Sequence, residues 1–468
     1  MSLEALFRPK SIAVFGASEK PTIGRRLIVS LDRIGFAGPI YPINPNYQTV
    51  LGRQCYPSIA ELPEAPEVAV FCLGHRLILD AFTAAAERGI KSAVIYDGGF
   101  AERDEAGRDL QDRIAAICRD AGIALCGPNC MGILNPIERN TTYLQEIRDP
   151  EALAGNVGIV SQSGGLCVSL LTDLCRFGFS HIVSCGNEAV VDAAAFLEYL
   201  VDDPYTRVIG GFIEAVRSPE RFAAALDRAA ALDKPVVLIK VGQSERSRRA
   251  VRTHTAGEAG DPAAFSQLTR AHRAIEVGDL AELTEVLAAC QGAKTPNGRR
   301  IGAITSSGGL AELMLDIAEE ADLRLPSLLP DTKADLDRLI GYVTGDGNPL
   351  DAWGNGTFAP NLDHALAALQ SSPEHDCVVL CRDNGLAQPM DVPETALNYL
   401  AQFARAAAAS DKPHYLLHTR PGQIDPAHVA CLREASIPIV CGIREGLGAI
   451  DRLARWNGWK SNADSGTD

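Results

Sequence analysis

The chain has 468 residues, of which 46% are hydrophobic and 22% are charged, and its formal net charge is −15. At roughly 150 residues per domain, this length predicts about three domains. The negative charge argues against a nucleic-acid-binding protein, which normally presents a basic face. We find no run of about 18 apolar residues and no signal peptide, and therefore expect a cytoplasmic protein. The 13 cysteines are scattered through apolar segments, so we expect reduced thiols and no metal site.

The N-terminal part alternates predicted strands with predicted helices. Residues 11–15 form a β-rich run, Gly16-Ala17-Ser18 follows as a turn, and Gly24 opens a helix over 25–34. Such a turn places free backbone N–H groups at a helix N-terminus, which is a ready anion site. The alternation predicts a parallel, doubly wound sheet. Its further strands are expected at 39–43, 68–73, 92–96 and 123–125, with helices at 77–88 and 107–121.

An NAD(P)-dependent oxidoreductase is one function for such a domain, but two features count against it. The dinucleotide fingerprint has three closely spaced glycines and an acidic residue about 20 positions further on. Here Gly24 is the next glycine after Gly16, and the second predicted strand ends in Asn44-Pro45-Asn46 rather than in a carboxylate.

A second strand, turn and helix begins after a predicted linker over 138–156. The strand covers 157–161, and the turn Gln162-Ser163-Gly164-Gly165 opens a helix over 166–177. Small residues in this turn allow a phosphate to sit directly on the first N–H groups of the helix. The same residues also suit a tight turn without a ligand.

Two carboxylates follow predicted strands of this second domain. Glu188 comes after the strand at 181–185 and Glu214 after the strand at 207–213. Carboxyl ends of parallel strands are where open α/β sheets place their sites. A carboxylate there can fix the tautomer of a histidine, although either residue can instead cap a helix.

His254 is the candidate partner of these carboxylates. It lies in the stretch 251–261, for which we predict a mobile loop that follows the basic residues Arg246, Arg248 and Arg249. An imidazole with a pKa near neutrality can attack a phosphoryl group and release it again. Taken alone, a histidine in a loop is more often a plain surface residue.

A third domain repeats the opening of the second. After a linker over 292–298, a strand at 300–305 and the turn Ser306-Ser307-Gly308-Gly309 lead into a helix over 311–321. This repeat predicts two related flavodoxin-like domains. Later strands are expected at 377–381, 414–417 and 438–441, and later helices at 393–408, 427–435 and 445–456. The predicted domains cover 6–135, 150–292 and 298–456, and 457–468 is predicted to be a disordered tail.

Four phrases in the first domain together resemble the CoA-binding domain of the nucleoside-diphosphate-forming acyl-CoA synthetases, relatives of succinyl-CoA synthetase. The phrases are Gly16-Ala17-Ser18, Gly38 to Pro45, Gly98 to Glu102 and Gly127 to Gly132. The resemblance implies an α/β protein with a Rossmann-like CoA-binding domain and two flavodoxin-like domains. It also implies that the turn from Gly16 to Gly24 receives the pyrophosphate of coenzyme A, and that Asn44 belongs to the CoA-binding residues. Pro128 and Asn129 would lie near the thiol arm of CoA.

The same resemblance assigns roles in the second domain. Ser163, Gly164 and Gly165 would belong to a helix that points at the phosphate, Glu214 would orient His254, and His254 would be phosphorylated. The family's loop usually has Ser before the histidine, where this chain has Thr253, and an apolar residue where this chain has Glu258. These differences concern the dynamics of the loop more than the role of the histidine.

The resemblance implies the α-type subunit of an ADP-forming acyl-CoA synthetase. The enzyme would interconvert carboxylic acid, CoA and ATP with acyl-CoA, ADP and phosphate, through an acyl phosphate and a phosphohistidine. We see no ATP-grasp domain, and therefore expect a separate β-type partner that carries ATP/ADP and Mg²⁺ in a hetero-oligomer. Short-chain acids are the default expectation, with aryl acids as the alternative. A catalytically inactive CoA-binding or regulatory protein is the alternative function.

Overall fold

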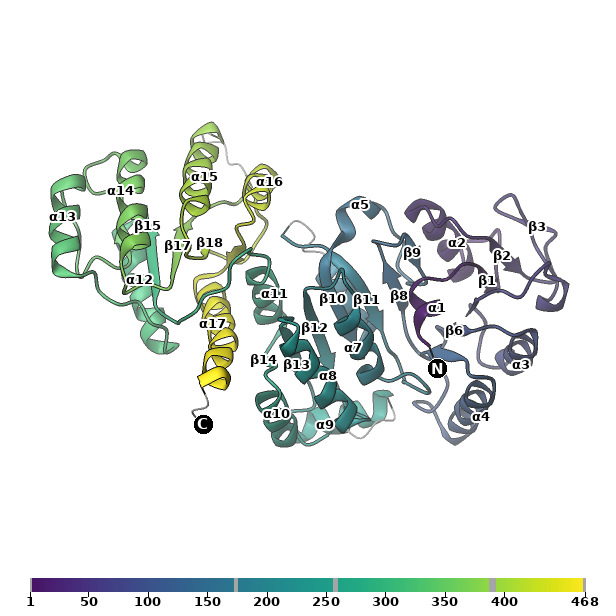
Figure 1. Cartoon of the computed structure of the whole chain (residues 1–468). Helices are drawn as coiled ribbons and strands as arrows, with labels where there is room; N and C mark the ends of the chain where they lie inside the picture. The colour runs from purple at the N-terminus through teal and green to yellow at the C-terminus, as the bar shows by residue number, and fades with distance from the viewer. Residues whose placement is uncertain (1, 172–175, 256–259, 387–392, 466–468) are drawn as a thin grey trace. The chain divides into compact units, whose positions relative to one another are not determined.

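The computed structural model describes residues 2–171, 176–255, 260–386 and 393–465 (Figure 1). The side chains of residues 252–255, 393 and 459–465 also lie outside this description. Contacts divide the chain into two compact units, unit 1 with residues 1–174 and 178–276, and unit 2 with residues 175–177 and 277–468. Within the described ranges, we find no helix that is both long and apolar enough to cross a membrane.

The first sheet of unit 1 confirms the predicted parallel, doubly wound arrangement. Its strand order is β2-β1-β5-β6-β7, and every neighbouring pair is parallel. The strands are β1 (Ile12–Phe15), β2 (Ile40–Ile43), β5 (Val68–Phe71), β6 (Ser92–Ile95) and β7 (Ala124–Cys126). The other elements are α1 (Glu4–Phe7), α2 (Ile23–Ile34), β3 (Thr49–Val50), β4 (Arg53–Gln54), η1 (Ile59–Glu61), α3 (Ile78–Arg88) and α4 (Glu105–Ala121).

Helix α2 shows why the sequence forms this domain. The Thr22 side chain caps its N-terminus, and Gly35 ends it with a φ of 80°, which suits glycine. Apolar residues spaced three and four apart give the helix one buried face. These residues are Leu27, Ile28, Leu31 and Ile34.

The second sheet of unit 1 has the strand order β14-β13-β12-β10-β11-β8-β9. Five of its strands follow the flavodoxin-like order, namely β10 (Ala154–Ser161), β11 (Phe179–Ser184), β12 (Val208–Ile213), β13 (Val236–Lys240) and β14 (Ile275–Val277). The helices in this part of the chain are α5 (Pro150–Leu153), α6 (Gly164–Leu170), α7 (Ala193–Asp202), α8 (Pro219–Ala231), α9 (Glu245–Thr255), α10 (Pro262–Ala271) and α11 (Leu280–Ala289). Helices α7 and α8 pack their apolar residues against this sheet (Figure 1).

The predicted linker over 138–156 contains regular structure, because a short strand at 140–141, helix α5 and the start of β10 lie within it. Strand β8 (Gly132–Asn135) runs antiparallel to β11, and β9 (Asn140–Thr141) pairs with β8. Side-chain hydrogen bonds hold this hairpin to the N-terminal segment, since Asn135 Nδ2 donates to the carbonyl oxygen of Phe7 at 3.0 Å. The first and second domains therefore share a hydrophobic core in unit 1.

Unit 2 contains a five-stranded sheet with the order β16-β15-β17-β18-β19, which repeats the flavodoxin-like order of the second sheet. The strands are β15 (Ile301–Thr305), β16 (Leu350–Asp351), β17 (Cys377–Arg382), β18 (His414–His418) and β19 (Ile439–Cys441). The helices are α12 (Gly308–Glu320), α13 (Pro330–Ile340), α14 (Phe358–Ser371), α15 (Pro393–Ala408), α16 (Pro426–Glu434) and α17 (Ile443–Ser465). This sheet order agrees with the flavodoxin-like fold that the sequence repeat predicted, although β16, α13 and α14 were not predicted.

Helix α11 belongs to unit 2 by its contacts. Its Glu285 is buried, pairs with Arg176 at 2.7 Å and accepts a hydrogen bond from the backbone N–H of Cys441 at 2.6 Å. The division between the units therefore falls after residue 276. The domain boundary at 292–298 stays a prediction.

Two further sequence predictions differ from the structure. Residues 457–465 of the predicted disordered tail are helical, since α17 continues to Ser465, and residues 466–468 lie outside the described residues. The predicted loop at 251–261 begins as helix, since α9 continues to Thr255. Local interactions favour α9, because Ser244 Oγ accepts the Ser247 N–H and Glu245 pairs with Arg249 at 2.9 Å. Residues 256–259 lie outside the described residues.

Candidate functional site

The turn after β1 is built by close backbone approaches. Gly16 has a φ of 77°, and a Cβ atom there would lie 2.4 Å from the carbonyl oxygen of Cys72. A Cβ atom on Gly24 would lie 2.7 Å from the carbonyl oxygen of Gly16. Only glycine fits at both positions, so α2 begins directly against the turn. The predicted residues Gly16 and Gly24 are therefore brought together.

Asn44 and Ser18 complete this turn. Asn44 Nδ2 donates to the carbonyl oxygen of Ala17 at 2.7 Å, and Asn44 Oδ1 accepts the Asn46 N–H at 3.0 Å. Ser18 Oγ lies 3.1 Å from the hydroxyl of Tyr47 and accepts the Lys20 N–H. The side chain of Asn44 thus fixes the backbone of the turn from the end of β2. Binding of CoA by these residues stays a prediction.

The loop that contains Pro128 and Asn129 packs against residues 186–188 of the second domain. Gly186 has a φ of 63°, and a Cβ atom there would lie 2.2 Å from the carbonyl oxygen of Pro128. That oxygen also accepts the backbone N–H of Asn187 at 2.8 Å. Asn129 Nδ2 donates to Asn187 Oδ1 at 3.2 Å. The loop predicted near the CoA thiol is therefore anchored on the second domain.

Glu102 closes the same interface from the first domain. Its Oε1 atom accepts the N–H groups of Gly99 and Phe100, and its Oε2 atom accepts Asn187 Nδ2 at 2.5 Å. Burial alone would raise the pKa of Glu102, but these hydrogen bonds lower it below the ordinary value. A carboxylate anion therefore holds Asn187 in place.

The predicted phosphate turn lies next to this loop. A Cβ atom on Gly164 would lie 2.5 Å from Cγ of Met131, so the side chain that follows Asn129 and Cys130 covers the turn. Ser161 Oγ accepts the Ser163 N–H at 3.1 Å. Gly165 is exposed, and no atom lies within 4 Å of a Cβ atom built there. The start of α6 therefore leaves open space next to Gly165.

Glu214 and Glu188 meet through one side chain that the sequence did not single out. Gln162 Oε1 accepts the backbone N–H groups of Glu214 at 2.6 Å and Ala215 at 3.0 Å. Gln162 Nε2 donates to Glu188 Oε1 at 2.8 Å. Arg217 Nε donates to Glu188 Oε2 at 3.0 Å. The structure thus joins the carboxylate of Glu188 and the backbone of Glu214 in one network at the carboxyl ends of β10, β11 and β12.

Burial raises the pKa of Glu188 to about 7, although the hydrogen bond from Gln162 and the charge of Arg217 oppose the shift. Because the pKa of Glu188 is higher in the folded state than the ordinary 4.5, its protonated carboxyl stabilises the fold at low pH. This stabilisation is lost as the pH rises from 4.5 through about 7. We expect this carboxyl to lower the free energy of unfolding of unit 1 by at most about 3 kcal/mol between pH 4.5 and 8.

Glu188→Gln should remove this part of the pH dependence. Urea unfolding of the parent and the variant at pH 5 and pH 8 measures the difference. Glu198→Gln is the matched control, because the Glu198 side chain is 39% exposed and pairs with Arg221 at 2.5 Å. An unchanged pH dependence in Glu188→Gln would contradict the assignment.

Lys240 is the second residue that the sequence analysis missed. It is 4% exposed, and its Nζ atom donates to the carbonyl oxygens of Glu214, at 2.7 Å, and of Val241. Burial lowers its pKa, while the charges of Glu214 and Glu276 oppose the shift. The available signal was a single lysine at the end of the apolar run Val-Val-Leu-Ile. For Gln162, the sequence showed only a polar turn residue.

His254 lies in the last turn of α9, which follows β13. Its side chain is outside the described residues, so the hydrogen bond between Glu214 and His254 stays a prediction. Among the described side chains, no group of three or more His, Cys, Asp and Glu residues has the geometry of a metal site.

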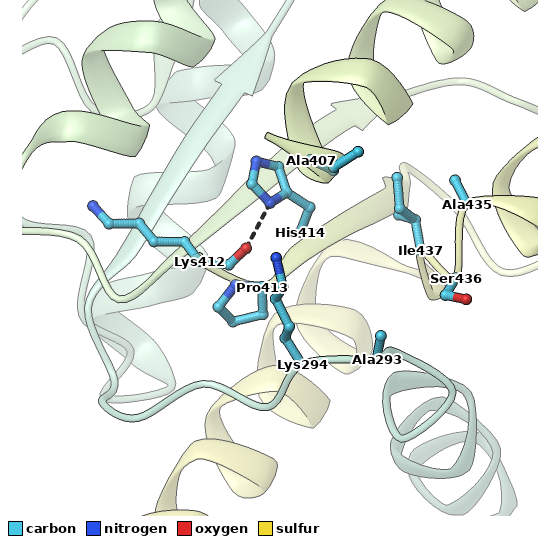
Figure 2. Close-up of a pocket in the computed structure, with 10 residues that line it drawn as sticks. Ala293, Lys294, Ala407, Lys412, Pro413, His414, Ala435, Ser436 and Ile437 are labelled. Carbon is cyan, nitrogen blue, oxygen red and sulfur yellow. Dashed lines mark hydrogen bonds between the residues drawn. The ribbon is translucent and has the colours of Figure 1, made fainter. Parts of the chain in front are cut away.

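A pocket in unit 2 lies at the opposite end of its sheet from the usual ligand end (Figure 2). It is lined by residues around the start of β18 and the segment before β19, including Lys294, Lys412 and His414. The Lys294 ammonium donates to the carbonyl oxygen of Ser410, and the Lys412 ammonium to those of Leu369 and Ser372. Burial lowers the pKa of His414 to about 4, so this ring is neutral at pH 7. These groups offer little to an anion.

Two family models match the chain, a CoA binding domain over residues 10–136 and a succinyl-CoA ligase like flavodoxin domain over residues 154–290. A trans-feruloyl-CoA synthase from an unknown prokaryotic organism is 36% identical over 368 residues, which are 77% of this chain and 52% of that protein. This chain therefore spans about half the length of that relative. The subunit alpha of acetate–CoA ligase (ADP-forming) I from Pyrococcus furiosus is 29% identical, over 98% of this chain and 99% of that subunit.

A solved structure is also similar over nearly the whole length. The dinucleotide-forming acetyl-coenzyme A synthetase 1 of Candidatus Korarchaeum cryptofilum, in complex with phosphate and ADP, has a TM-score of 0.82 and 26% identity. The alignment covers 98% of this chain and 99% of that one.

Proposed function

Because this chain belongs to the family of ADP-forming acyl-CoA ligases, we propose that it is the α-type subunit of such an enzyme. The reaction is the reversible conversion of carboxylic acid, CoA and ATP into acyl-CoA, ADP and phosphate. The match over 99% of a relative named subunit alpha supports the proposal of a separate partner. That partner would carry the ATP-grasp fold and hold ATP/ADP with Mg²⁺.

The packing around residues 127–131 is the observation that supports this proposal most directly. This loop contacts residues 186–187 on one side and Gly164 on the other. A thiol arm that follows the loop would end next to the start of α6, where small residues leave space for a phosphate. Glu214 lies in the same network through Gln162. Under this proposal, CoA binding, acyl transfer and phosphoryl transfer would take place next to one another in unit 1.

The residues support the following sequence of steps. A phosphate oxygen attacks the thioester carbon of acyl-CoA, and the CoA thiolate leaves, which gives an acyl phosphate. N–H groups of Ser163, Gly164 and Gly165 hold the phosphate oxygens. A nitrogen of His254 then attacks phosphorus, and the carboxylate of the acid leaves. Glu214 holds the other ring nitrogen and stabilises the charge that develops on the ring. The phosphorylated His254 finally transfers its phosphoryl group to the nucleoside diphosphate on the partner.

Transfer of label from γ-labelled ATP tests this proposal. The chain is incubated with its partner in an extract of its native cells, and acetate and ferulate, the acids named in two relatives, are offered with CoA. We expect a base-stable, acid-labile label on this chain, ADP rather than AMP as the nucleotide product, and CoA binding by calorimetry. CoA binding without label, in an extract with a confirmed active partner, would leave only a CoA-binding module.

A further inference from the structure

The amide of Gln162 uses its complete hydrogen-bonding capacity. A glutamine amide has two N–H donors and an oxygen with two lone pairs. Gln162 Oε1 accepts from the N–H groups of Glu214 and Ala215, and Nε2 donates to Ala215 O at 2.8 Å and to Glu188 Oε1. Gln162 is 7% exposed. A buried polar group that is fully satisfied in this way fixes its partners in one arrangement.

The backbone partners of Gln162 follow directly after the end of a strand, beyond the regular β-sheet hydrogen bonds. Strand β12 ends at Ile213, and Glu214 is the next residue. Its N–H group is held by Gln162, and its carbonyl oxygen is held by Lys240 Nζ. Two side chains from the neighbouring strand ends therefore replace the missing ladder hydrogen bonds on the two sides of Glu214.

The same amide connects Glu214 with the interface between the first two domains. Glu188 Oε2 accepts Arg217 Nε, and Arg217 Nη2 donates to the carbonyl oxygen of Asn187 at 3.0 Å. Asn187 contacts both Asn129 and Glu102 of the first domain. A continuous set of hydrogen bonds therefore runs from Glu214 to the loop around Asn129.

We propose that Gln162 is a positioning residue for phosphoryl transfer, which holds Glu214 in a fixed place relative to the loop around Asn129. This inference rests on the proposed function, because it assigns Glu214 the task of orienting His254. Gln162 itself touches neither substrate nor phosphate in this role. It acts through the backbone of Glu214.

Two substitutions of Gln162 test the inference in the complex of this chain with its partner. Gln162→Met keeps the volume but removes all four hydrogen bonds, and a misplacement of about 1 Å at the site can cost about 100-fold in rate. We therefore expect the initial rate of labelling from γ-labelled ATP to fall about 100-fold. The dissociation constant for CoA, measured by calorimetry, should stay within about threefold, because the turn after β1 is untouched.

Gln162→Glu gives a readout that a loss of stability alone does not give. The carboxyl oxygen that replaces Nε2 faces two acceptors, Glu188 Oε1 and Ala215 O, so the bond requires a proton. Two facing carboxylates share that proton at low pH and repel each other at high pH. The rate of Gln162→Glu relative to the parent should therefore be at least about tenfold higher at pH 6 than at pH 8. The charged and titratable groups around this amide are Glu188, Glu214, Arg217, Asp192, Cys185 and Lys240.

Gln402→Glu is the matched control. Gln402 is 8% exposed in unit 2, and its amide donates to Ala359 O at 2.7 Å. This variant should show the pH profile of the parent. Two outcomes would overturn the inference alone, provided that the parent is labelled. One is a Gln162→Met variant that is labelled at the parent rate. The other is a Gln162→Glu variant whose rate relative to the parent does not change with pH. An unlabelled parent would overturn the proposed function and the inference with it.

Discussion

Replacement of His254 by alanine is expected to abolish labelling of this chain from γ-labelled ATP, with a fall of at least about 1000-fold in the initial rate. The imidazole is the proposed nucleophile, and alanine offers no atom that can carry a phosphoryl group. A phosphoramidate on imidazole keeps a high transfer potential, which suits a reversible reaction. Helix α9, which contains His254, follows β13, whose last residue is Lys240. Lys240 contacts the backbone of Glu214.

His272→Ala is the matched control for this experiment. His272 lies in the same unit, is partly buried, and pairs with Asp227 at 2.8 Å. Its removal should leave labelling and CoA binding unchanged. The measurement is the acid-labile, base-stable radioactivity on the purified chain after short incubations. A His254→Ala chain that is labelled at the parent rate would place the nucleophile at another residue.

The alternation of strands and helices was enough to predict all five strands of the first sheet, because each βαβ unit leaves a local pattern of apolar residues. In the other two sheets, β13, β14 and β16 were not predicted. The hairpin of β8 and β9 leaves no such pattern. Strand β8 has only four residues and β9 only two, and the neighbouring strand β11 begins 44 residues after the end of β8. Its place in the second sheet depends on tertiary contacts, such as the hydrogen bond from Asn135 to Phe7 O. For that reason residues 132–135 were not predicted as a strand, and residues 140–141 were predicted as part of a linker.

Helix α9 was missed for a different reason. Its sequence is rich in arginine and lacks a clear apolar face, so periodicity predicts a loop. The local signals were a capping serine at 244 and an acidic residue four positions before Arg249. These signals are visible in the sequence and favour a helix that begins before the histidine.

The site shows a clear limit of sequence reasoning. Ser163 and Glu214 were chosen because each follows a predicted strand, and the structure confirms that both follow strands of the same sheet. The joining residue is Gln162, whose partners are 26 and 52 residues away along the chain. Nothing near Gln162 in the sequence indicates these partners. Only the side-by-side ends of parallel strands bring Gln162, Glu188 and Glu214 together.

Replacement of Glu214 by glutamine is expected to lower the initial rate of phosphorylation about 1000-fold, without loss of CoA binding. Glutamine has nearly the same volume as glutamate, so the backbone contacts with Gln162 and Lys240 can persist. The change removes the negative charge that would favour one tautomer of His254 and stabilise the positive ring during transfer. The measurement is the labelling rate at saturating ATP. Glu198→Gln, on the surface of the same unit, serves as the control.

The combination of Glu214→Gln with Gln162→Met separates two explanations for the network. If Gln162 acts only through Glu214, its removal should cost little once the carboxylate is gone, because effects of residues that act as a unit are not additive. The double variant should then be within about threefold of Glu214→Gln alone. A further loss of about 100-fold in the double variant would show that Gln162 contributes independently of the carboxylate. In that case the Gln162 amide would support the turn from Ser163 to Gly165, since Ser163 directly follows Gln162 in the chain.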